Sequence, residues 1–333
     1  MIQDLLKQND QKLIELLRDR LFLLKASELS ATKTETSDVT PLLAKADVPE
    51  SIWKSLIHSC DDTLNNAPQS PIDNNVVPRK ITIVGGRGRM GKFFSTQLTD
   101  AGHHVSVLQA SDWEYAEELL SHVDLVLVSV PIESTVDVIK RVTKYISPTT
   151  ALTDLTSIKT EPVQAMMDNH RGAVLGLHPM FGPNVKSFAG QKVIVCPGRD
   201  DDSFKWFLDF MASRGGDLIL CSPEEHDQMM IFIQATQHFS RFSLGVFLAQ
   251  QEIDIERSLL FATASYSQEI DIVKRLFAQS ALLCIDIMLN SKERRQAIAQ
   301  LANTYNYLAS LVVQEDRSAL IEEFEKTQSF FNK

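Results

Sequence analysis

A glycine-rich loop constrains the fold more than any other feature of the chain. The segment GRGRMG at residues 86–91 fits the pattern G-x-G-x-x-G. It directly follows an apolar, β-branched run at residues 81–84 and opens a predicted helix at residues 90–101, and another apolar run follows at residues 105–108. A strand, a glycine turn and a helix in this order form the phosphate-binding part of a β-α-β unit. The loop therefore predicts an α/β fold built on a parallel sheet.

Further short apolar runs extend this prediction along the chain, at residues 125–130, 152–155, 174–177, 193–196 and 218–221. The early runs alternate with stretches of helical character, which is typical of a parallel sheet covered on both faces. From about residue 223 onward only helices are expected. We therefore expect an α/β protein with a Rossmann-type NAD(P)-binding domain at residues 80–222 and an all-α domain at residues 223–333. By analogy with other folds of this kind, the all-α domain is expected to supply the substrate pocket and the dimer interface.

The N-terminal part has a different character. Residues 1–26 carry leucines at helical spacing and predict an amphipathic helix, and residues 26–46 are polar and rich in Ser and Thr. A second short helix is expected after Pro49. Prolines among Asn, Asp and Gln then indicate a linker at residues 65–79. We expect residues 1–64 to form a short helical segment ahead of the sheet domain.

Composition excludes several classes of protein. The net charge is −10 and no Lys/Arg run occurs, which argues against a nucleic-acid partner. A small anionic substrate would need a locally basic pocket. No uncharged apolar run is long enough for a membrane span, and no signal peptide is recognisable, so a cytoplasmic protein is expected. The four cysteines have no metal-binding spacing, so we expect reduced thiols and no metal site.

Each glycine of the loop has an expected role. Gly86 permits the tight turn, Gly88 lets the backbone approach a pyrophosphate, and Gly91 allows the helix to pack closely on the strand. Gln109 stands where an acid usually binds the ribose hydroxyl. It can still bond a hydroxyl, but it does not repel a 2′-phosphate as an acid would, and Arg87 or Arg89 could bind one. NAD is expected, and NADP is left open. The residues expected to contact the cofactor are Gly86, Gly88, Arg89, Met90, Gly91, Gln109, Ser129 and Pro131.

Six blocks carry a family resemblance: ITIVGGRGRMGKFF, LVLVSVPI, DLTSIK, VLGLHPMFGP, EEHDQMMIFIQATQHF and KRLFAQ, in this order. Together they resemble the prephenate dehydrogenase part of bacterial bifunctional chorismate mutase/prephenate dehydrogenases, over about residues 80–330. The resemblance implies hydride transfer to NAD(P), decarboxylation of prephenate to 4-hydroxyphenylpyruvate for tyrosine biosynthesis, and a homodimer formed through the C-terminal helices. The substrate would be a small anionic cyclohexadiene.

This chemistry requires one base that is neutral near pH 7 and cations for two carboxylates. His178, in the HPMFGP block, matches the catalytic histidine of the family; a structural histidine at a strand end is the alternative. Ser157 matches the family serine near the substrate hydroxyl, and a helix N-cap is its alternative.

The substrate-binding residues implied by the resemblance lie in the helical part. Arg275 matches the arginine that binds a substrate carboxylate, with a solvated surface arginine as the alternative. His238 matches a histidine of the substrate or tyrosine pocket, and a hydrogen-bonded core histidine is an equal alternative. Tyr266 is expected at the same pocket. His226 also matches, and is expected as a hydrogen-bonding residue at a helix start.

Two departures from the family leave the substrate open. Ser267 stands where the family has an arginine. The N-terminal part resembles a shortened chorismate mutase domain that keeps Arg20 but has no further arginine before Arg79, so we expect no mutase activity; chorismate turnover by the purified protein would contradict this. Oxidation of 4-amino-4-deoxyprephenate in secondary metabolism, of arogenate, or a nucleotide-sensing role without catalysis are the alternatives to prephenate oxidation.

Overall fold

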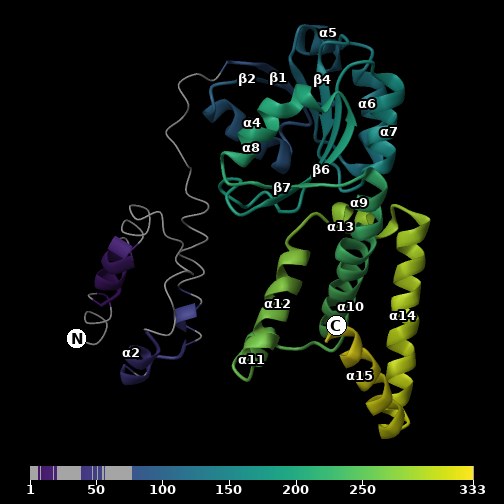
Figure 1. Cartoon of the computed structure of the whole chain (residues 1–333). Coiled ribbons are helices and arrows are strands. Elements are labelled where there is room, and N and C mark those ends of the chain that lie inside the picture. Colours follow the sequence, from purple (N-terminus) through teal and green to yellow (C-terminus); the bar gives the residue numbers. More distant parts are fainter. Residues whose placement is uncertain are drawn as a thin grey trace.

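The structure is a computed structural model of the whole chain. It describes residues 77–332 without a break and, before them, residues 7, 9–17, 19–20, 39–46, 48–50, 52–54 and 56. The linker predicted at residues 65–79 lies outside the described residues up to residue 76, and so does Cys60. Figure 1 shows a sheet domain covered by helices, with a group of long helices extending from it.

A seven-stranded sheet in the order β2-β1-β3-β4-β5-β6-β7 forms the first domain. Strands β1 to β5 run parallel to one another, as the alternation of apolar runs and helices predicts. The strands are β1 (Lys80–Val84), β2 (His104–Leu108), β3 (Leu125–Val128), β4 (Ala151–Asp154), β5 (Val174–Pro179), β6 (Lys192–Arg199) and β7 (Asp217–Leu220). The chain reverses strand order between β1 and β3, and in such sheets ligands bind beyond the carboxyl ends of the strands at this point.

One strand departs from the expected parallel arrangement. Strand β6 runs antiparallel to β5, with His178 opposite Ile194, while β7 is parallel to β6. The segment between β5 and β6 contains no helix, and a parallel crossover needs a longer connection that is usually helical. A direct antiparallel return is therefore the arrangement that this short connection allows.

Helices cover both faces of the sheet, each with its own core. On one face α4 (Arg89–Asp100) and α8 (Lys205–Ala212) pack phenylalanines against Ile81, Ile83 and Leu177. On the other face lie α5 (Ala116–Leu120), α6 (Ile132–Val142) and α7 (Thr160–Asn169), packed on Val84, Val126 and Val174. The short helices η3 (Trp113–Tyr115) and η4 (Asp201–Phe204) complete this domain. Because strands β1, β3, β4 and β5 are buried on both sides, their residues do not alternate between apolar and polar, as the runs in the sequence predict. Thr82, Thr153, Asp154 and His178 are the buried polar residues of these strands.

Residues 223–332 contain helices and no strand, as expected. The helices are α9 (Pro223–Met230), η5 (Ile231–Thr236), α10 (Gln237–Gln250), α11 (Ile255–Leu259), α12 (Ala264–Phe277), α13 (Ala281–Leu289), α14 (Lys292–Val313) and α15 (Arg317–Phe331). Helix η5 is a π-helix that joins α9 to α10 in one continuous rod. Figure 1 shows α10, α12 and α14 extending away from the sheet domain. None of the helices in the described ranges is long and apolar enough to span a membrane.

Part of the N-terminal segment is helical. Residues 9–17 are helical and expose Leu13, Ile14 and Leu16, and α2 (Thr40–Lys45) forms within the polar segment, with Pro41 in its first turn. The guanidinium of Arg20 lies 5.2 Å from the ring centre of Trp53, so these two predicted helices touch through a cation–π contact.

Candidate active site

His178 lies on β5, close to the strand's carboxyl end, and only 3% of its surface is exposed. Successive side chains of a strand alternate between faces, and Leu175 and Leu177 belong to the core under α4 and α8. His178 therefore points to the opposite face, on which α7 and α9 lie. There its ring meets that of His226, with 5.0 Å between ring centres.

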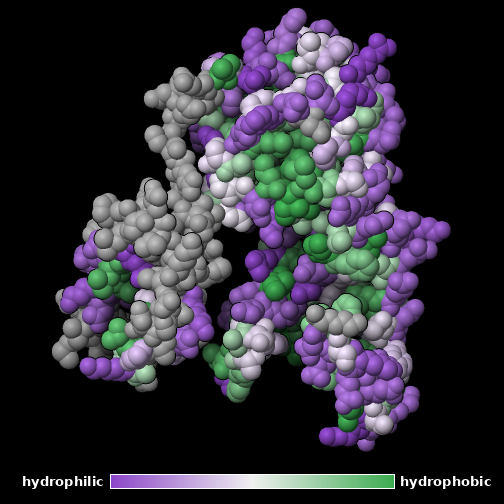
Figure 2. All heavy atoms as spheres, viewed as in Figure 1, coloured by the Kyte–Doolittle hydropathy of each residue, from purple (hydrophilic) through white to green (hydrophobic). Residues whose placement is uncertain are grey.

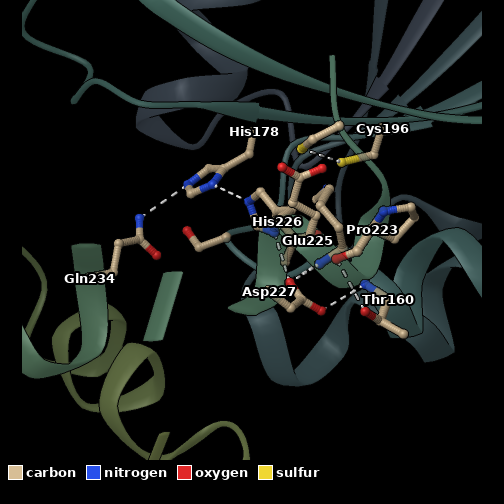
Figure 3. A network of polar contacts seen from close by, with 12 residues as sticks. Thr160, His178, Cys196, Pro223, Glu225, His226, Asp227 and Gln234 are labelled. Atoms are coloured by element: carbon tan, nitrogen blue, oxygen red, sulfur yellow. Dashed lines mark hydrogen bonds and ion pairs between the residues drawn. The ribbon is translucent and has the colours of Figure 1, made fainter. Parts of the chain in front are cut away.

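A chain of hydrogen bonds leads from His178 to a carboxylate. Nδ1 of His178 is 2.8 Å from Nε2 of His226, and Nδ1 of His226 is 2.8 Å from Oδ1 of Asp227 (Figure 3). The ionised carboxylate only accepts, so His226 donates from Nδ1 and its Nε2 must accept. His178 then donates from Nδ1, which leaves Nε2 of His178 without a proton. The chain thus fixes the tautomer in which His178 can act as a base.

Asp227 is held at the N-terminus of helix α7. Its carboxylate accepts the backbone N–H of Lys159 at 2.8 Å and that of Thr160 at 2.9 Å, two donors that a helix start leaves without partners of its own. Burial opposes ionisation of Asp227, but the hydrogen bonds from His226, Thr160 and Lys159 outweigh it and lower the pKa to about 2. The carboxylate therefore stays charged throughout the neutral range.

Burial lowers the pKa of His178 well below its usual value, and the neighbouring His226, Lys159 and Arg294 lower it further, against a smaller opposing effect of Asp227. Burial likewise lowers the pKa of His226, although its bond to Asp227 opposes the shift. The imidazole of His178 is therefore neutral at pH 7. A neutral imidazole with an unprotonated Nε2 is the form that a general base needs.

The π-helix η5 places Gln234 beside this base. Nε2 of Gln234 is 3.2 Å from Nε2 of His178, and Oε1 of Gln234 is buried with no partner among the described residues (Figure 3). His238 follows one turn later and bonds through Nδ1 to the carbonyl of Gln234 at 2.8 Å. Single π-helical turns are rare and often occur at functional sites. Half-buried His238 thus bonds the backbone of a residue that contacts His178. Its position is consistent with a histidine of the substrate or tyrosine pocket and with a hydrogen-bonded core histidine.

Ser157 is tied to the helical domain through Arg294. The guanidinium of Arg294 on α14 is buried and donates to the carbonyls of Ser157 at 3.2 Å and Ile287 at 2.9 Å. Helix α7 has Lys159 as its N-cap residue, with no side-chain cap, so the alternative expectation of Ser157 as the cap is wrong. The cap is instead supplied by Asp227 from the other domain.

The glycine loop joins β1 to α4 at the switch in strand order. Gly85 adopts φ +83°, and a Cβ there would lie 2.2 Å from the carbonyl oxygen of Ser129. The residue that permits the tight turn is therefore Gly85 rather than Gly86. A Cβ on Gly91 would lie 2.6 Å from the carbonyl of Gly85, which agrees with the close helix packing expected there.

The loop has the features that a dinucleotide needs. Helix α4 begins at Arg89 and Met90, after exposed Gly88, with no side-chain cap and no acid in its first turn. Its free N–H groups and the positive end of the helix dipole therefore suit a pyrophosphate. Ser129 and Pro131 follow β3 beside this loop, and Pro131 is the N-cap residue of α6.

Gln109 lies directly after β2 and braces the loop. With its amide oxygen facing the loop, it accepts the N–H of Gly86 at 3.1 Å and of Arg87 at 2.8 Å. Asp112 turns back to accept the N–H of Gln109 at 3.2 Å. Its pKa is lowered by its bond from Ser111 and, to a smaller extent, by Arg87. A carboxylate thus stands near the end of β2 after all, three residues later than the usual acid.

Two expected substrate residues lie apart from His178. Arg275 is exposed on α12, and within residues 77–332 it makes no hydrogen bond or ion pair. The hydroxyl of Tyr266 donates to Ser258 Oγ at 3.2 Å, which ties α12 to α11. The structure therefore does not bring Arg275 or Tyr266 together with His178 in one chain.

Sequence reasoning missed four residues around the base: Lys159, Asp227, Gln234 and Arg294. Only Asp227 had a local signal, since it follows His226 directly. The others meet His178 through contacts between segments far apart in the sequence, which spacing does not reveal.

Two of the described cysteines lie close together. Sγ of Cys196 is 4.0 Å from Sγ of Cys221, close to the site (Figure 3), and burial raises the pKa of both thiols. Among the described residues, no group of His, Cys, Asp and Glu could hold a metal ion.

Comparisons with known proteins identify the family. The nucleotide-binding domain of prephenate dehydrogenase matches residues 95–220, and the dimerization domain of prephenate dehydrogenase matches residues 222–326. The T-protein of Haemophilus influenzae is 35% identical over 309 residues, covering 93% of this chain and 79% of the relative. The T-protein of Enterobacter agglomerans is 39% identical over 253 residues, covering 76% and 68%.

Solved structures share the fold. Prephenate dehydrogenase from A. aeolicus, in complex with hydroxyphenyl propionate and NAD+, aligns with a TM-score of 0.60 at 21% identity, over 77% of this chain and 98% of that chain. Arogenate dehydrogenase from Synechocystis aligns with a TM-score of 0.53 at 16% identity, over 76% and 98%. The chain therefore belongs to the prephenate dehydrogenase family and is a decarboxylating, NAD(P)-dependent oxidoreductase of that type.

Proposed function

We propose that this enzyme oxidises prephenate to 4-hydroxyphenylpyruvate and CO₂, with hydride transfer to NAD. The observation that carries the proposal is the chain Asp227–His226–His178, which leaves Nε2 of His178 unprotonated. This base lies at the carboxyl edge of the sheet, the edge at which the glycine loop leaves β1. A base of this kind is what removal of the 4-hydroxyl proton requires.

His178 takes the proton of the substrate's 4-hydroxyl on Nε2, and the bond that its Nδ1 donates to His226 stabilises the imidazolium that forms. The charge of Asp227 acts on His178 through His226. A bound nicotinamide would supply the acceptor for the hydride from C4. The developing ketone is conjugated to the carbon that bears the ring carboxylate, so CO₂ leaves, and the ring becomes aromatic as its oxygen takes the proton back from His178. Ser157 is proposed to bond the 4-hydroxyl, and Arg275, with His238 and Tyr266, to line the carboxylate side of the pocket.

The loop at residues 86–91 is proposed to hold the pyrophosphate, with Arg89 and Met90 at the helix start and Ser129 and Pro131 beside the nicotinamide. NAD is proposed over NADP because Asp112 adds negative charge near the end of β2. Because the amide oxygen of Gln109 bonds the N–H groups of Gly86 and Arg87, Gln109 would contribute to binding the adenosine part of NAD indirectly, by holding the backbone of the glycine loop.

A homodimer formed by the helical domain is part of the proposal. Helices α10 to α15 expose many large apolar side chains, more than an isolated soluble domain usually leaves uncovered. Figure 2 shows apolar residues reaching the surface of this region. The large apolar side chains that are exposed in residues 237–331 include Phe247, Leu260, Phe261, Phe277, Leu282, Leu289, Val312, Val313, Phe324, Phe330 and Phe331. Light scattering of the purified chain should give twice the mass of one chain, and a monomer would contradict the proposal.

Initial rates of nicotinamide reduction test the substrate and the cofactor together. Prephenate, arogenate and 4-amino-4-deoxyprephenate are each offered with NAD and with NADP. We expect the highest kcat/KM with prephenate and NAD. Preference for the amino compound would assign the chain to secondary metabolism. Preference for arogenate would agree with the relative from Methanocaldococcus jannaschii described as a probable arogenate/prephenate dehydrogenase, which is 29% identical over 271 residues.

A base variant separates an enzyme from a nucleotide-sensing homologue. His178→Asn should lower kcat by roughly 10²- to 10⁴-fold and leave the Kd for NAD within about twofold, because the ring does not touch the loop. His104→Asn on the exposed end of β2 is the matched control and should keep wild-type rates. If no substrate is oxidised while NAD binds, the sensing role replaces the enzymatic one.

A further inference from the structure

Lys159 is a lysine whose side chain is wholly inside the protein. Neither its side chain nor that of its partner Asp154 is exposed at all. Its aliphatic part runs beneath β5 at Gly176, where an added Cβ would lie 3.1 Å from Cδ of Lys159. Fully buried lysines are rare. The absence of a side chain on Gly176 leaves room for this one.

The ammonium group ties two strands together at the site. Nζ of Lys159 is 2.5 Å from Oδ2 of Asp154, at the end of β4, and 2.8 Å from the carbonyl of Leu177 on β5. Leu177 directly precedes His178. A shift of the ammonium would therefore move the peptide that carries the base.

The backbone of the same residue holds the far end of the hydrogen-bond chain. The N–H of Lys159 donates to Oδ1 of Asp227 at 2.8 Å, the oxygen that also bonds His226. Lys159 thus contacts the peptide before His178 through its side chain and the carboxylate of Asp227 through its backbone. It is the residue at which both ends of the chain Asp227–His226–His178 are fixed.

Stability alone does not account for this ion pair. A buried pair contributes little net stability, because desolvation costs about as much as the attraction returns. This pair is also incompletely bonded, since Oδ1 of Asp154 is buried without a partner among the described residues, while Oδ2 accepts Lys159 and both the N–H and the hydroxyl of Thr156. Two apolar residues would pack at least as well at this position.

We propose that Lys159 is a positioning residue of the dehydrogenase, which sets the placement and the protonation of His178 from one buried ammonium group. The proposal rests on the proposed function, because it assigns the base. The charged and titratable groups that face His178 are His226 and Asp227 from α9, Lys159 from the start of α7, and Arg294 from α14. Of these, only Lys159 also bonds the strand that carries His178.

The test removes both charges of the buried ion pair together, so that neither charge is left without its counterion. In the double variant Lys159→Met, Asp154→Asn, the new amide oxygen can keep both bonds from Thr156, and the amide nitrogen takes the place of unpartnered Oδ1. Lys205→Met is the control, since Lys205 forms an exposed ion pair with Asp209. Side-chain ¹⁵N spectra of histidine report the tautomer and titration of His178, assigned with His178→Asn. Steady-state rates and NAD binding are measured on the same samples.

The double variant should fold and bind NAD within about twofold of wild type. Its kcat should fall roughly 10- to 100-fold with a smaller change in KM, and His178 should titrate at a higher pH than in the wild type. The acidic limb of the kcat profile should move in the same direction. Lys205→Met should match wild type in all readouts.

Unchanged His178 spectra together with wild-type kcat would overturn the proposal and leave Lys159 a structural residue. If the double variant does not fold, Gly176→Ala decides. Its Cβ would lie 2.6 Å from Cγ2 of Val163 and 3.1 Å from Cδ of Lys159, so it crowds the aliphatic part of Lys159 and keeps the charge. Wild-type kcat together with unchanged His178 spectra in that variant would overturn the proposal. The NMR result does not depend on turnover. A wild-type chain that oxidises no substrate would refute the proposed function, while the spectra still decide the role of Lys159.

Discussion

Replacing Asp227 by asparagine keeps the shape of the side chain and removes its charge. The carboxylate accepts three hydrogen bonds, from His226 and from the N–H groups of Lys159 and Thr160. An amide has only one acceptor oxygen, so one of these donors must face the NH₂ group instead. The variant therefore loses at least one hydrogen bond as well as the charge.

The magnitude follows from the pKa of Asp227, which falls from 3.8 to about 2 on folding. Each pKa unit corresponds to about 1.4 kcal/mol, so ionisation of Asp227 contributes roughly 2 kcal/mol to the free energy of unfolding at neutral pH. The side chain is 29% exposed, so this is an upper range. A folded-state pKa below the unfolded value means that the contribution is complete above pH 3.8 and is lost as the pH falls toward 2.

Urea unfolding at pH 7.5, followed by circular dichroism, measures the loss. Asp227→Asn should lower the free energy of unfolding by roughly 2 kcal/mol. Asp209→Asn, which removes a carboxylate that is 62% exposed in an i,i+4 pair with Lys205, should change it by less than about 0.5 kcal/mol. The reasoning is refuted if the two variants lose the same amount. The kcat of Asp227→Asn should also fall, by roughly 10- to 10³-fold, since the analogous change in a serine protease triad costs about 10⁴-fold with one imidazole fewer in between.

Three further predictions concern other parts of the molecule. Gly85→Ala forces an L side chain to φ +83° with Cβ 2.2 Å from the Ser129 carbonyl. NAD binding, measured by fluorescence, should therefore be lost, or the chain should not fold. The control Gly102→Ala, at φ +88° with open space around it, should fold and bind NAD. Burial lowers the pKa of five histidines, namely His103, His170, His178, His226 and His238. The free energy of unfolding should therefore be constant above pH 6.5 and fall below it as the unfolded chain takes up protons, by about 1.4 kcal/mol at pH 5.5 for each histidine that stays neutral. A urea midpoint equal at pH 7.5 and 5.5 would contradict this. Arg294→Met removes the bond to the Ser157 carbonyl and should lower kcat at least about tenfold with the Kd for NAD unchanged, while the exposed Arg295→Met should not.

Local signals predicted the sheet domain well, because each strand contains a short, mainly apolar run and each early crossover is helical. The glycine loop located β1, α4 and the cofactor edge, and the HPMFGP block located His178. The reversal at β6 escaped prediction, since an apolar run is the same in either direction. The turn glycine was assigned one residue too late because Gly85 and Gly86 are adjacent, and only the backbone angle distinguishes them.

The surroundings of the base were far less predictable. Asp227 reaches His226 within its own helix turn, but its bonds to the start of α7 join residues that are far apart in the chain. Lys159 is polar in sequence and buried in the fold, so pattern reasoning places it at the surface. The KRLFAQ motif drew attention to Arg275, but a motif cannot show where a residue lies in the fold. It could not reveal that Arg275 is apart from His178 within one chain.

The π-helical segment at Ile231–Thr236 gives the rod one place at which its length can change. A π-turn accommodates one more residue than an α-turn, so deleting a single residue there would let the rod become α-helical throughout while later residues keep nearly the same direction about the axis. The same deletion within α10 would rotate every later residue of the rod by about 100°. The contact face of α10 would therefore survive the first deletion and turn away from its partners after the second.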